Sequence, residues 1–159
     1  MTSCLIALSL WLIVTGGSQA TDAAPLPAAL RAHVQGERFG IVTSIRGLPL
    51  GVRDQLQKLF GGGTLDIAEP GAAFQVTDVM VTPRLPIRRL VAAGCSADHC
   101  LVYYERGGIA HTWHLALFYW TPGATRLEGG GMAPWGLASV DDLRSAILSG
   151  AIKGAAKNW

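Results

Sequence analysis

The sequence predicts an α+β domain: an antiparallel β-meander of three to five strands with two or three helices packed on one face. Two observations carry this prediction. Three runs rich in β-branched and aromatic residues follow one another between residues 87 and 120, separated only by short turn signals. Amphipathic stripes at helical spacing come before and after these runs along the chain, which predicts the helices.

An apolar stretch opens the chain and indicates an export signal. The run from Cys4 to Val14 has one polar interruption, and small residues follow it up to Ala20. Such a run matches the hydrophobic region of a signal peptide and is too short to cross a bilayer. We therefore expect residues 1–20 to be a cleaved signal peptide and residues 21–159 to form a single domain. The mature protein would be periplasmic or secreted, with no stable membrane insertion.

Two helices and a short strand are expected before the main sheet. Leu26, Leu30 and Val34 recur at helical spacing, with a proline near the first turn. Residues 39–45 are rich in β-branched side chains and predict a strand. A second helix is predicted by an apolar stripe that ends at three glycines. The members of this stripe are Val52, Leu56, Leu59 and Phe60.

The three runs of the meander span residues 87–93, 101–106 and 109–120. A fourth strand is expected near residues 125–128 or 132–135. A last helix should follow the sheet. Its start is predicted by Ser139 and Asp142, which together resemble a capping box, and its end by Gly150.

A tight turn at Gly107-Gly108 would join the last two runs of the meander. It would pair Tyr104 with His111 and Tyr103 with Thr112. Because side chains alternate along a strand, this pairing sorts them onto two faces. One face is expected to be core and would hold Val102, Tyr104, Ile109, Trp113 and Leu115.

The other face is the candidate binding surface. It would carry Tyr103, Glu105, Thr112 and His114, with Arg88 from the preceding strand. Tyr and Arg commonly anchor protein interfaces, which favours a recognition patch. The alternative is an ordinary solvated sheet face, on which a Glu105–Arg88 ion pair would contribute little.

Two cysteines, Cys95 and Cys100, remain after removal of the signal peptide. They lie between two predicted strands in a chain sent to an oxidising compartment, so we expect them to form a disulfide with each other. The alternatives are a redox pair or a metal site that includes His99. The metal alternative lacks a second ligand pair nearby, and thioredoxin-like chemistry uses a two-residue spacer.

His111 and His114 form an H-x-x-H sequence, which on a helix would favour a shared metal. On the predicted strand their side chains point to opposite faces, so no shared metal is expected. Neither a metal nor another cofactor is therefore predicted for this chain.

Charge and motifs narrow the function classes. The formal net charge of +2 does not favour nucleic acid as a partner. No Walker A, G-x-S-x-G, H-E-x-x-H or dinucleotide fingerprint occurs in the sequence. The favoured hypothesis is a non-catalytic periplasmic binding protein that engages an envelope protein, as an inhibitor or immunity-type module.

Two alternatives remain open. A binder of small molecules or cell-wall fragments would use the aromatic residues and need a closed apolar pocket beneath Trp113 or Trp120. A hydrolase would use His114 and Glu105 as acid and base, within hydrogen-bond reach of each other in a cleft.

Five short segments of the chain carry a resemblance to a known group. They are Leu48-Pro49, Glu69-Pro70-Gly71, Thr77-Asp78, Arg88-Arg89-Leu90 and Tyr103-Tyr104-Glu105-Arg106-Gly107-Gly108. In these segments the chain resembles small exported proteins of proteobacteria with no assigned activity. The resemblance covers most of the mature chain and implies a periplasmic single domain. It transfers no catalytic residue.

Overall fold

The computed structural model describes residues 26–79 and 84–153, so the predicted signal peptide lies outside the described residues. Along the chain the elements are α1 (Ala28–Gly36), β1 (Gly40–Val42), the 3-10 helix η1 (Ile45–Gly47), α2 (Leu50–Leu59), β2 (Arg88–Cys95), β3 (His99–Arg106), β4 (Thr112–Thr121), β5 (Ala124–Met132) and α3 (Val140–Ser149). Among the described residues, no helix combines the length and apolar character that a membrane span requires.

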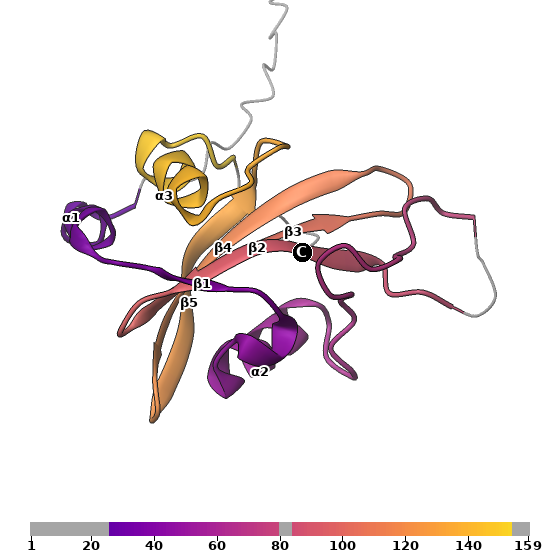
Figure 1. Ribbon diagram of the computed structural model, residues 1–159, viewed down its shortest axis with the longest axis horizontal. Helices are drawn as coiled ribbons and strands as arrows, with labels where there is room; N and C mark the ends of the chain where they lie inside the picture. Colours follow the sequence, from indigo (N-terminus) through magenta and orange to yellow (C-terminus); the bar gives the residue numbers. More distant parts are fainter. Residues whose placement is uncertain (1–25, 80–83, 154–159) are drawn as a thin grey trace, which may run out of the picture.

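The five strands form one sheet in the order β1-β2-β3-β4-β5, and every neighbouring pair is antiparallel. The α+β class and the predicted meander are therefore confirmed (Figure 1). The predicted last helix is also confirmed as α3. Ser139 accepts a hydrogen bond from the Asp142 backbone N–H in a capping box, and Gly150 ends the helix in the left-handed conformation.

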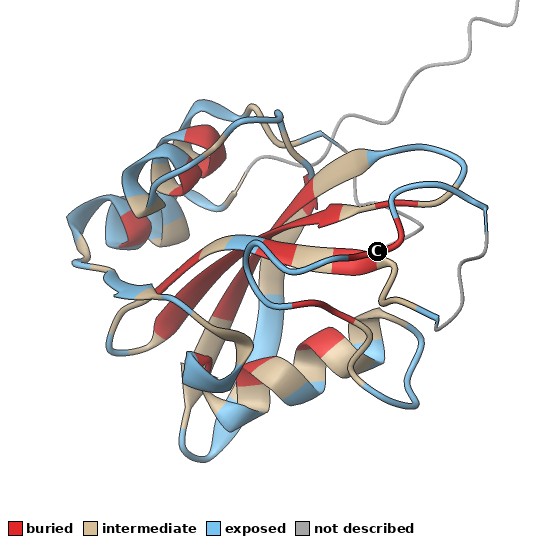
Figure 2. Ribbon diagram, turned by 45° about the vertical axis from the view of Figure 1, so that its right-hand side comes forward, coloured by how far each residue is buried: buried red, intermediate tan, exposed pale blue. Residues whose placement is uncertain are grey.

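Helices cover both faces of the sheet, with α2 on one side and α1 and α3 on the other (Figure 1). Packing on a single face was expected, and this detail is wrong. The central strand β3 shows the physical reason. Its residues His99 to Glu105 are all buried, so both of its faces need cover (Figure 2). Consecutive apolar and aromatic residues, as in Leu101 to Tyr104, are typical of a strand buried on both sides.

Two apolar cores result, one on each face of the sheet. On the α2 face, the buried members are Leu48, Val52, Leu56, Ile67, Leu90, Ala93, Cys100, Val102, Tyr104, Ala116 and Phe118. On the α1–α3 face, they are Val34, Leu101, Tyr103, Leu115, Leu117, Leu143, Ala146 and Ile147.

The β3–β4 register differs from the predicted one. Tyr104 lies opposite His114, and Tyr103 lies opposite Leu115, so the connection comprises residues 107–111. The predicted two-residue turn is wrong because Gly107 serves another purpose. A Cβ atom on Gly107 would lie 1.9 Å from the backbone oxygen of Gln75, so this glycine lets another chain segment pack against the end of β3.

The shift in register is three residues, an odd number, so it regroups the side chains of the two strands. Ile109, expected in the core, is 96% exposed at the tip of the connection. Tyr104 and His114 share the α2 face, where their rings stack at 5.2 Å between centroids.

Candidate functional site

The five predicted contact residues do not share one exposed surface. Tyr103 and Glu105 lie on the α1–α3 face, whereas Arg88, Thr112 and His114 lie on the α2 face. All except Thr112 are buried. Their grouping on one open face is therefore wrong, because the register is shifted and helices cover both sides of the sheet. A binding role for the individual residues stays a prediction.

Glu105 pairs with different partners from the one expected. Its Oε1 lies 2.6 Å from Arg89 Nη2, and its Oε2 lies 2.7 Å from His111 Nε2. The Arg89 guanidinium also lies over the Phe74 ring, 4.5 Å from its centroid. The predicted Glu105–Arg88 pair is replaced by this network, since Arg88 lies on the opposite face and contacts Asp66 and Phe60.

His114 is held away from Glu105. Its Nε2 lies 2.9 Å from Thr112 Oγ1 on the α2 face. Burial lowers the pKa of His114 to about 4, and the positive charges of Arg106 and Arg88 act in the same direction. The acid–base pair of the hydrolase hypothesis is not formed, because His114 and Glu105 lie on opposite faces of the sheet. His111 and His114 also lie on opposite faces, as expected.

The predicted disulfide joins Cys95 and Cys100, which lie opposite each other at the end of the β2–β3 pair. Both cysteines pack into the core on the α2 face, and Cys100 is fully buried. The His99 side chain points to the other side, where it contacts α1. The alternative metal site built from Cys95, His99 and Cys100 is therefore not formed.

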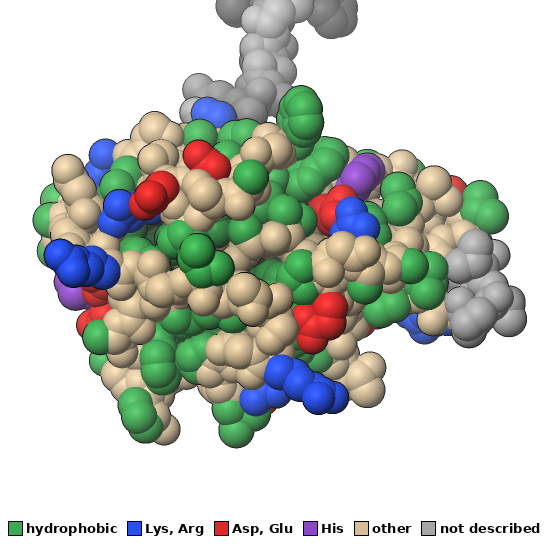
Figure 3. Space-filling view, viewed as in Figure 1, with side chains coloured by type: hydrophobic (Ala, Val, Ile, Leu, Met, Phe, Trp, Pro, Cys, Tyr) green, Lys and Arg blue, Asp and Glu red, His purple; other side chains and the backbone are tan. Residues whose placement is uncertain are grey.

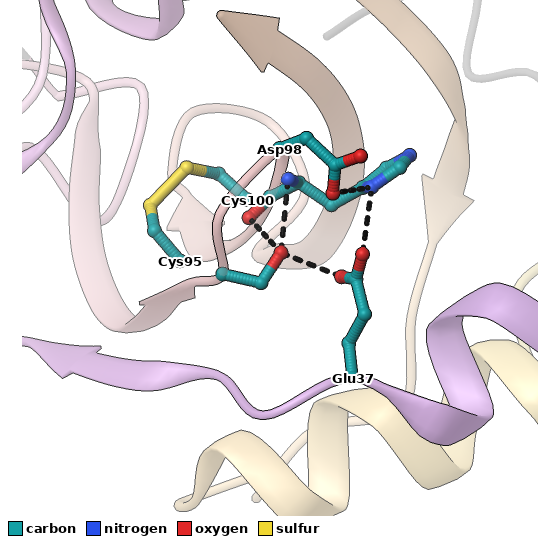
Figure 4. The surroundings of a disulfide bond; sticks show 6 residues. Glu37, Cys95, Asp98 and Cys100 are labelled. Atoms are coloured by element: carbon teal, nitrogen blue, oxygen red, sulfur yellow. Dashed lines mark hydrogen bonds and ion pairs between the residues drawn. A yellow bond between two sulfur atoms is a disulfide. The ribbon is translucent and has the colours of Figure 1, made fainter.

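A different group of metal-ligating side chains meets on the α1 side of this disulfide. His33 lies in the last turn of α1 and Glu37 directly follows that helix, while Asp98 lies in the β2–β3 turn and His99 begins β3. One ligand atom from each residue lies within 4.8 Å of the other three. We call these four residues the histidine–carboxylate cluster. Figure 4 shows Glu37 and Asp98 approaching from two different parts of the chain.

The four ligand atoms are two imidazole nitrogens and two carboxylate oxygens, and each oxygen contacts both nitrogens. Asp98 Oδ1 lies 2.9 Å from His99 Nδ1 and 3.2 Å from His33 Nε2. Glu37 Oε1 lies 3.3 Å from His99 Nδ1 and also contacts His33 Nε2. The four contacts therefore form a ring in which nitrogen and oxygen atoms alternate.

The cluster is buried at one end and open at the other. The His99 side chain is 5% exposed and that of Glu37 12%, whereas those of Asp98 and His33 are 35% and 45% exposed. Such a gradient gives a small ion a path from solvent while the inner ligands stay fixed.

Neighbouring groups hold the inner ligands in place. The Ser96 hydroxyl donates to Glu37 Oε2 at 2.5 Å and accepts from the His99 backbone N–H at 3.0 Å. Arg144 of α3 donates to the Glu37 carbonyl oxygen at 2.7 Å, which fixes the chain where it leaves α1. The His99 ring packs edge-on against Tyr119 of β4. These contacts resemble the outer partners that orient ligands in metal sites.

The cluster also favours charge on its outer carboxylate. A hydrogen bond with Glu37, followed by those with His99 and His33, lowers the pKa of Asp98 from 3.8 to about 2. Ser96 is not placed as an acyl-transfer nucleophile, because its hydroxyl donates to the Glu37 carboxylate rather than to an imidazole.

The imidazole hydrogens cannot serve every nitrogen–oxygen contact of the cluster at once. It contains four nitrogen–oxygen contacts, two at each imidazole nitrogen. An imidazole nitrogen carries at most one hydrogen, so it donates well to only one of its two oxygens. A cation among the four atoms would interact favourably with all of them at once.

The sequence held part of this signal. His33 lies in the predicted first helix, Glu37 follows it after four positions, and Asp98 and His99 are adjacent. No local pattern connects the two pairs. Proximity in sequence associates His99 only with the neighbouring cysteines, whereas its contact with α1 arises from the fold.

The aromatic hypothesis required a closed apolar pocket beneath Trp113 or Trp120. Trp120 instead borders an open cleft of about 360 Å³ between α2 and the β4–β5 turn. Its lining mixes apolar side chains such as Leu50 with the charged Asp54 and Lys58. Trp113 stacks on His111 with 4.3 Å between ring centroids. This cleft is therefore not the closed apolar pocket that the hypothesis requires.

Comparison with known proteins finds no matching family model, no matching curated protein and no matching solved structure. The resemblance to small exported proteins stays a prediction. The chain's own residues, and above all the histidine–carboxylate cluster, carry the functional conclusion.

Proposed function

We propose that this chain is an exported, non-catalytic binding domain whose ligand is a divalent transition-metal ion, best represented by Zn²⁺. The ligands are His33 Nε2, Glu37 Oε1, Asp98 Oδ1 and His99 Nδ1. The observation that carries the proposal is the convergence of these four atoms within 4.8 Å of one another, from two separate parts of the chain.

The donor set selects the class of ion. Imidazole nitrogens suit zinc and its neighbours among the transition metals, and two imidazoles with two carboxylates supply the four ligands of a tetrahedral zinc site. Calcium and magnesium prefer shells made only of oxygen. Nitrogen and oxygen ligands also suit an exported protein, because they need no reduced thiol in an oxidising compartment.

A protein of the envelope as partner has less support. Four of the five residues assigned to that contact are buried, and the five are divided between two faces. On the face shown in Figure 3, apolar side chains alternate with small acidic and basic groups, which does not single out a replacement surface. Ion binding therefore has the better-defined site.

Calorimetric titration of the chelator-treated protein with Zn²⁺ tests the proposal. We expect one site per chain and much weaker binding of Ca²⁺ and Mg²⁺. The variant His33→Ala should weaken Zn²⁺ binding by more than about tenfold, the lower end of the cost of losing even an outer partner of a metal ligand. His33 is suitable because its described side-chain contacts are with the cluster itself.

The matched control is His111→Ala. His111 is a partly exposed histidine with a carboxylate partner, Glu105, but it lies outside the cluster. Its replacement should leave Zn²⁺ affinity unchanged. Equal losses in the two variants, or no Zn²⁺ binding by the unaltered protein, would contradict the proposal.

A further inference from the structure

The Cys95–Cys100 disulfide encloses the turn that carries half of the histidine–carboxylate cluster. Asp98 and His99 lie between the two cysteines, as does Ser96, which holds Glu37. The cysteines lie opposite each other as the last pair before the turn. Figure 4 shows the disulfide beside the turn from which the Asp98 side chain extends.

The sulfur atoms are not themselves ligands. Cys95 and Cys100 pack into the core on the α2 face, and the cluster lies on the α1 side of the sheet. Side chains of adjacent strand residues point to opposite faces, so His99 and Cys100 cannot turn to the same ion while β3 stays intact. Any influence of the disulfide on the ion must pass through the backbone of the turn.

That influence is to reduce the freedom of two ligands. Without the disulfide, the turn is closed by the Ser96 N–H donating to the His99 carbonyl at 2.7 Å and by the Ser96 hydroxyl. A short cross-linked loop samples far fewer conformations than an open one. Ligands that are already ordered lose less conformational entropy when the ion binds, so the affinity for the ion is higher.

We propose that the affinity of the cluster for its ion depends on the Cys95–Cys100 disulfide, so that a dithiol reductant weakens binding and releases the ion. This inference rests on the proposed function. It makes the protein a metal binder that retains its ion in an oxidising compartment and gives it up in a reducing one.

The reducing step balances as an ordinary thiol–disulfide exchange. A thiolate of the dithiol attacks Cys95, the less buried of the two cysteines, and Cys100 leaves as a thiolate that takes up a proton. The second thiol of the reductant then displaces Cys95 from the mixed disulfide. The products are two protein thiols and one oxidised dithiol.

Linkage makes the effect reciprocal. If the disulfide strengthens ion binding by a given factor, the bound ion must favour the disulfide over the dithiol by the same factor. For this two-electron couple, a tenfold factor lowers the reduction midpoint by about 30 mV.

The test compares Zn²⁺ titrations of two proteins, the oxidised unaltered protein and the variant Cys95→Ala/Cys100→Ala. Both are expressed as the full chain and then purified. We expect the variant to bind at least about tenfold more weakly, as for the loss of outer support in other metal sites. Equal affinities would overturn this inference and leave the proposed function intact. Failure of the oxidised protein to bind Zn²⁺ would instead remove the proposed function.

A second measurement decides the matter if the double variant does not fold. The unaltered protein is equilibrated in glutathione redox buffers, with free Zn²⁺ either held at a saturating level or removed by a chelator. The reduction midpoint should be lower with Zn²⁺, and the midpoint of His33→Ala should respond much less. An unchanged midpoint in the unaltered protein would overturn the inference.

Discussion

At the scale of single residues, His99 has the most demanding position in the candidate site. Its Nδ1 contacts both carboxylates, its backbone N–H donates to Ser96, and its ring packs against His33 and Tyr119. An imidazole restrained in this way is a preorganised ligand, because little rotational freedom remains to be lost on ion binding. The exposed His33 would complete the proposed ligand shell from the solvent side.

His114 gives a prediction on pH that does not involve the ion. Its pKa falls from an ordinary 6.5 to about 4 in the folded protein, chiefly through burial. Between pH 6.5 and about pH 4, His114 is therefore protonated in the unfolded chain but neutral in the folded protein. Stability should fall across this window as pH decreases, by about 3 kcal/mol from this residue alone.

Urea unfolding of the unaltered protein and His114→Gln measures this contribution. Glutamine stays neutral and can still hydrogen-bond to Thr112. The stability advantage of the unaltered protein over the variant should therefore shrink as pH is lowered from 7 to 4. An advantage that is the same at both pH values would show that His114 titrates alike in the folded and unfolded chains.

At the scale of elements, the end of β3 explains why the predicted register failed. Two adjacent glycines flanked by β-rich runs usually indicate a two-residue turn. Here Gly107 and Gly108 pack instead against residues 75–77. The Gly107 N–H donates to Ile87 O, and the Gly108 N–H donates to Val76 O. The two glycines allow a close long-range contact with residues 75–77, and no local sequence pattern predicts this contact.

Gly107→Ala tests this explanation. The added Cβ would lie 1.9 Å from Gln75 O and 2.7 Å from Val76 Cα, and backbone atoms cannot rotate away as a flexible side chain does. We expect a loss of about 1–3 kcal/mol or more in the free energy of unfolding, as for overpacked sites in general.

The matched control is Gly123→Ala in the β4–β5 turn. There an added Cβ meets nothing within 4 Å and the backbone is not in the left-handed region. Its effect on stability should stay within about 0.5 kcal/mol. Denaturant unfolding of both variants decides the point, and equal effects would refute a role for close packing at Gly107.

At the scale of the whole molecule, the cluster ties the N-terminal helix to the sheet. Two of its four ligands come from the end of α1 and two from the β2–β3 turn and the start of β3. An ion bound there would cross-link the two elements in the folded state only. Ion binding and global stability should therefore be coupled.

Thermal unfolding with and without Zn²⁺ measures this coupling. With free Zn²⁺ at one hundred times its dissociation constant, the folded state should gain about 2.7 kcal/mol, and Tm should rise by several degrees. Glu37→Gln should abolish most of this gain because Glu37 contacts both imidazoles. His111→Ala should retain it. A Zn²⁺-induced rise in Tm that persists undiminished in Glu37→Gln would place the ion elsewhere.

Sequence alone determined the features that depend on neighbouring residues. The α+β class, the meander, the cap of α3 and the Cys95–Cys100 pairing follow from local periodicity, capping and compartment, and all are present in the structure. Hydrophobic alternation and helix capping involve only a few neighbouring residues, so both can be predicted from the sequence alone.

Only the tertiary structure decided which sheet faces are covered, how β3 and β4 are registered, and which side chains form the candidate site. His33 meets Asp98 across 65 positions of sequence, and Glu37 meets His99 across 62. Such meetings depend on the packing of α1 against one face of the sheet, which is chosen by the sum of many weak apolar contacts. No short segment contains that information, so the cluster becomes visible only when the whole chain is folded.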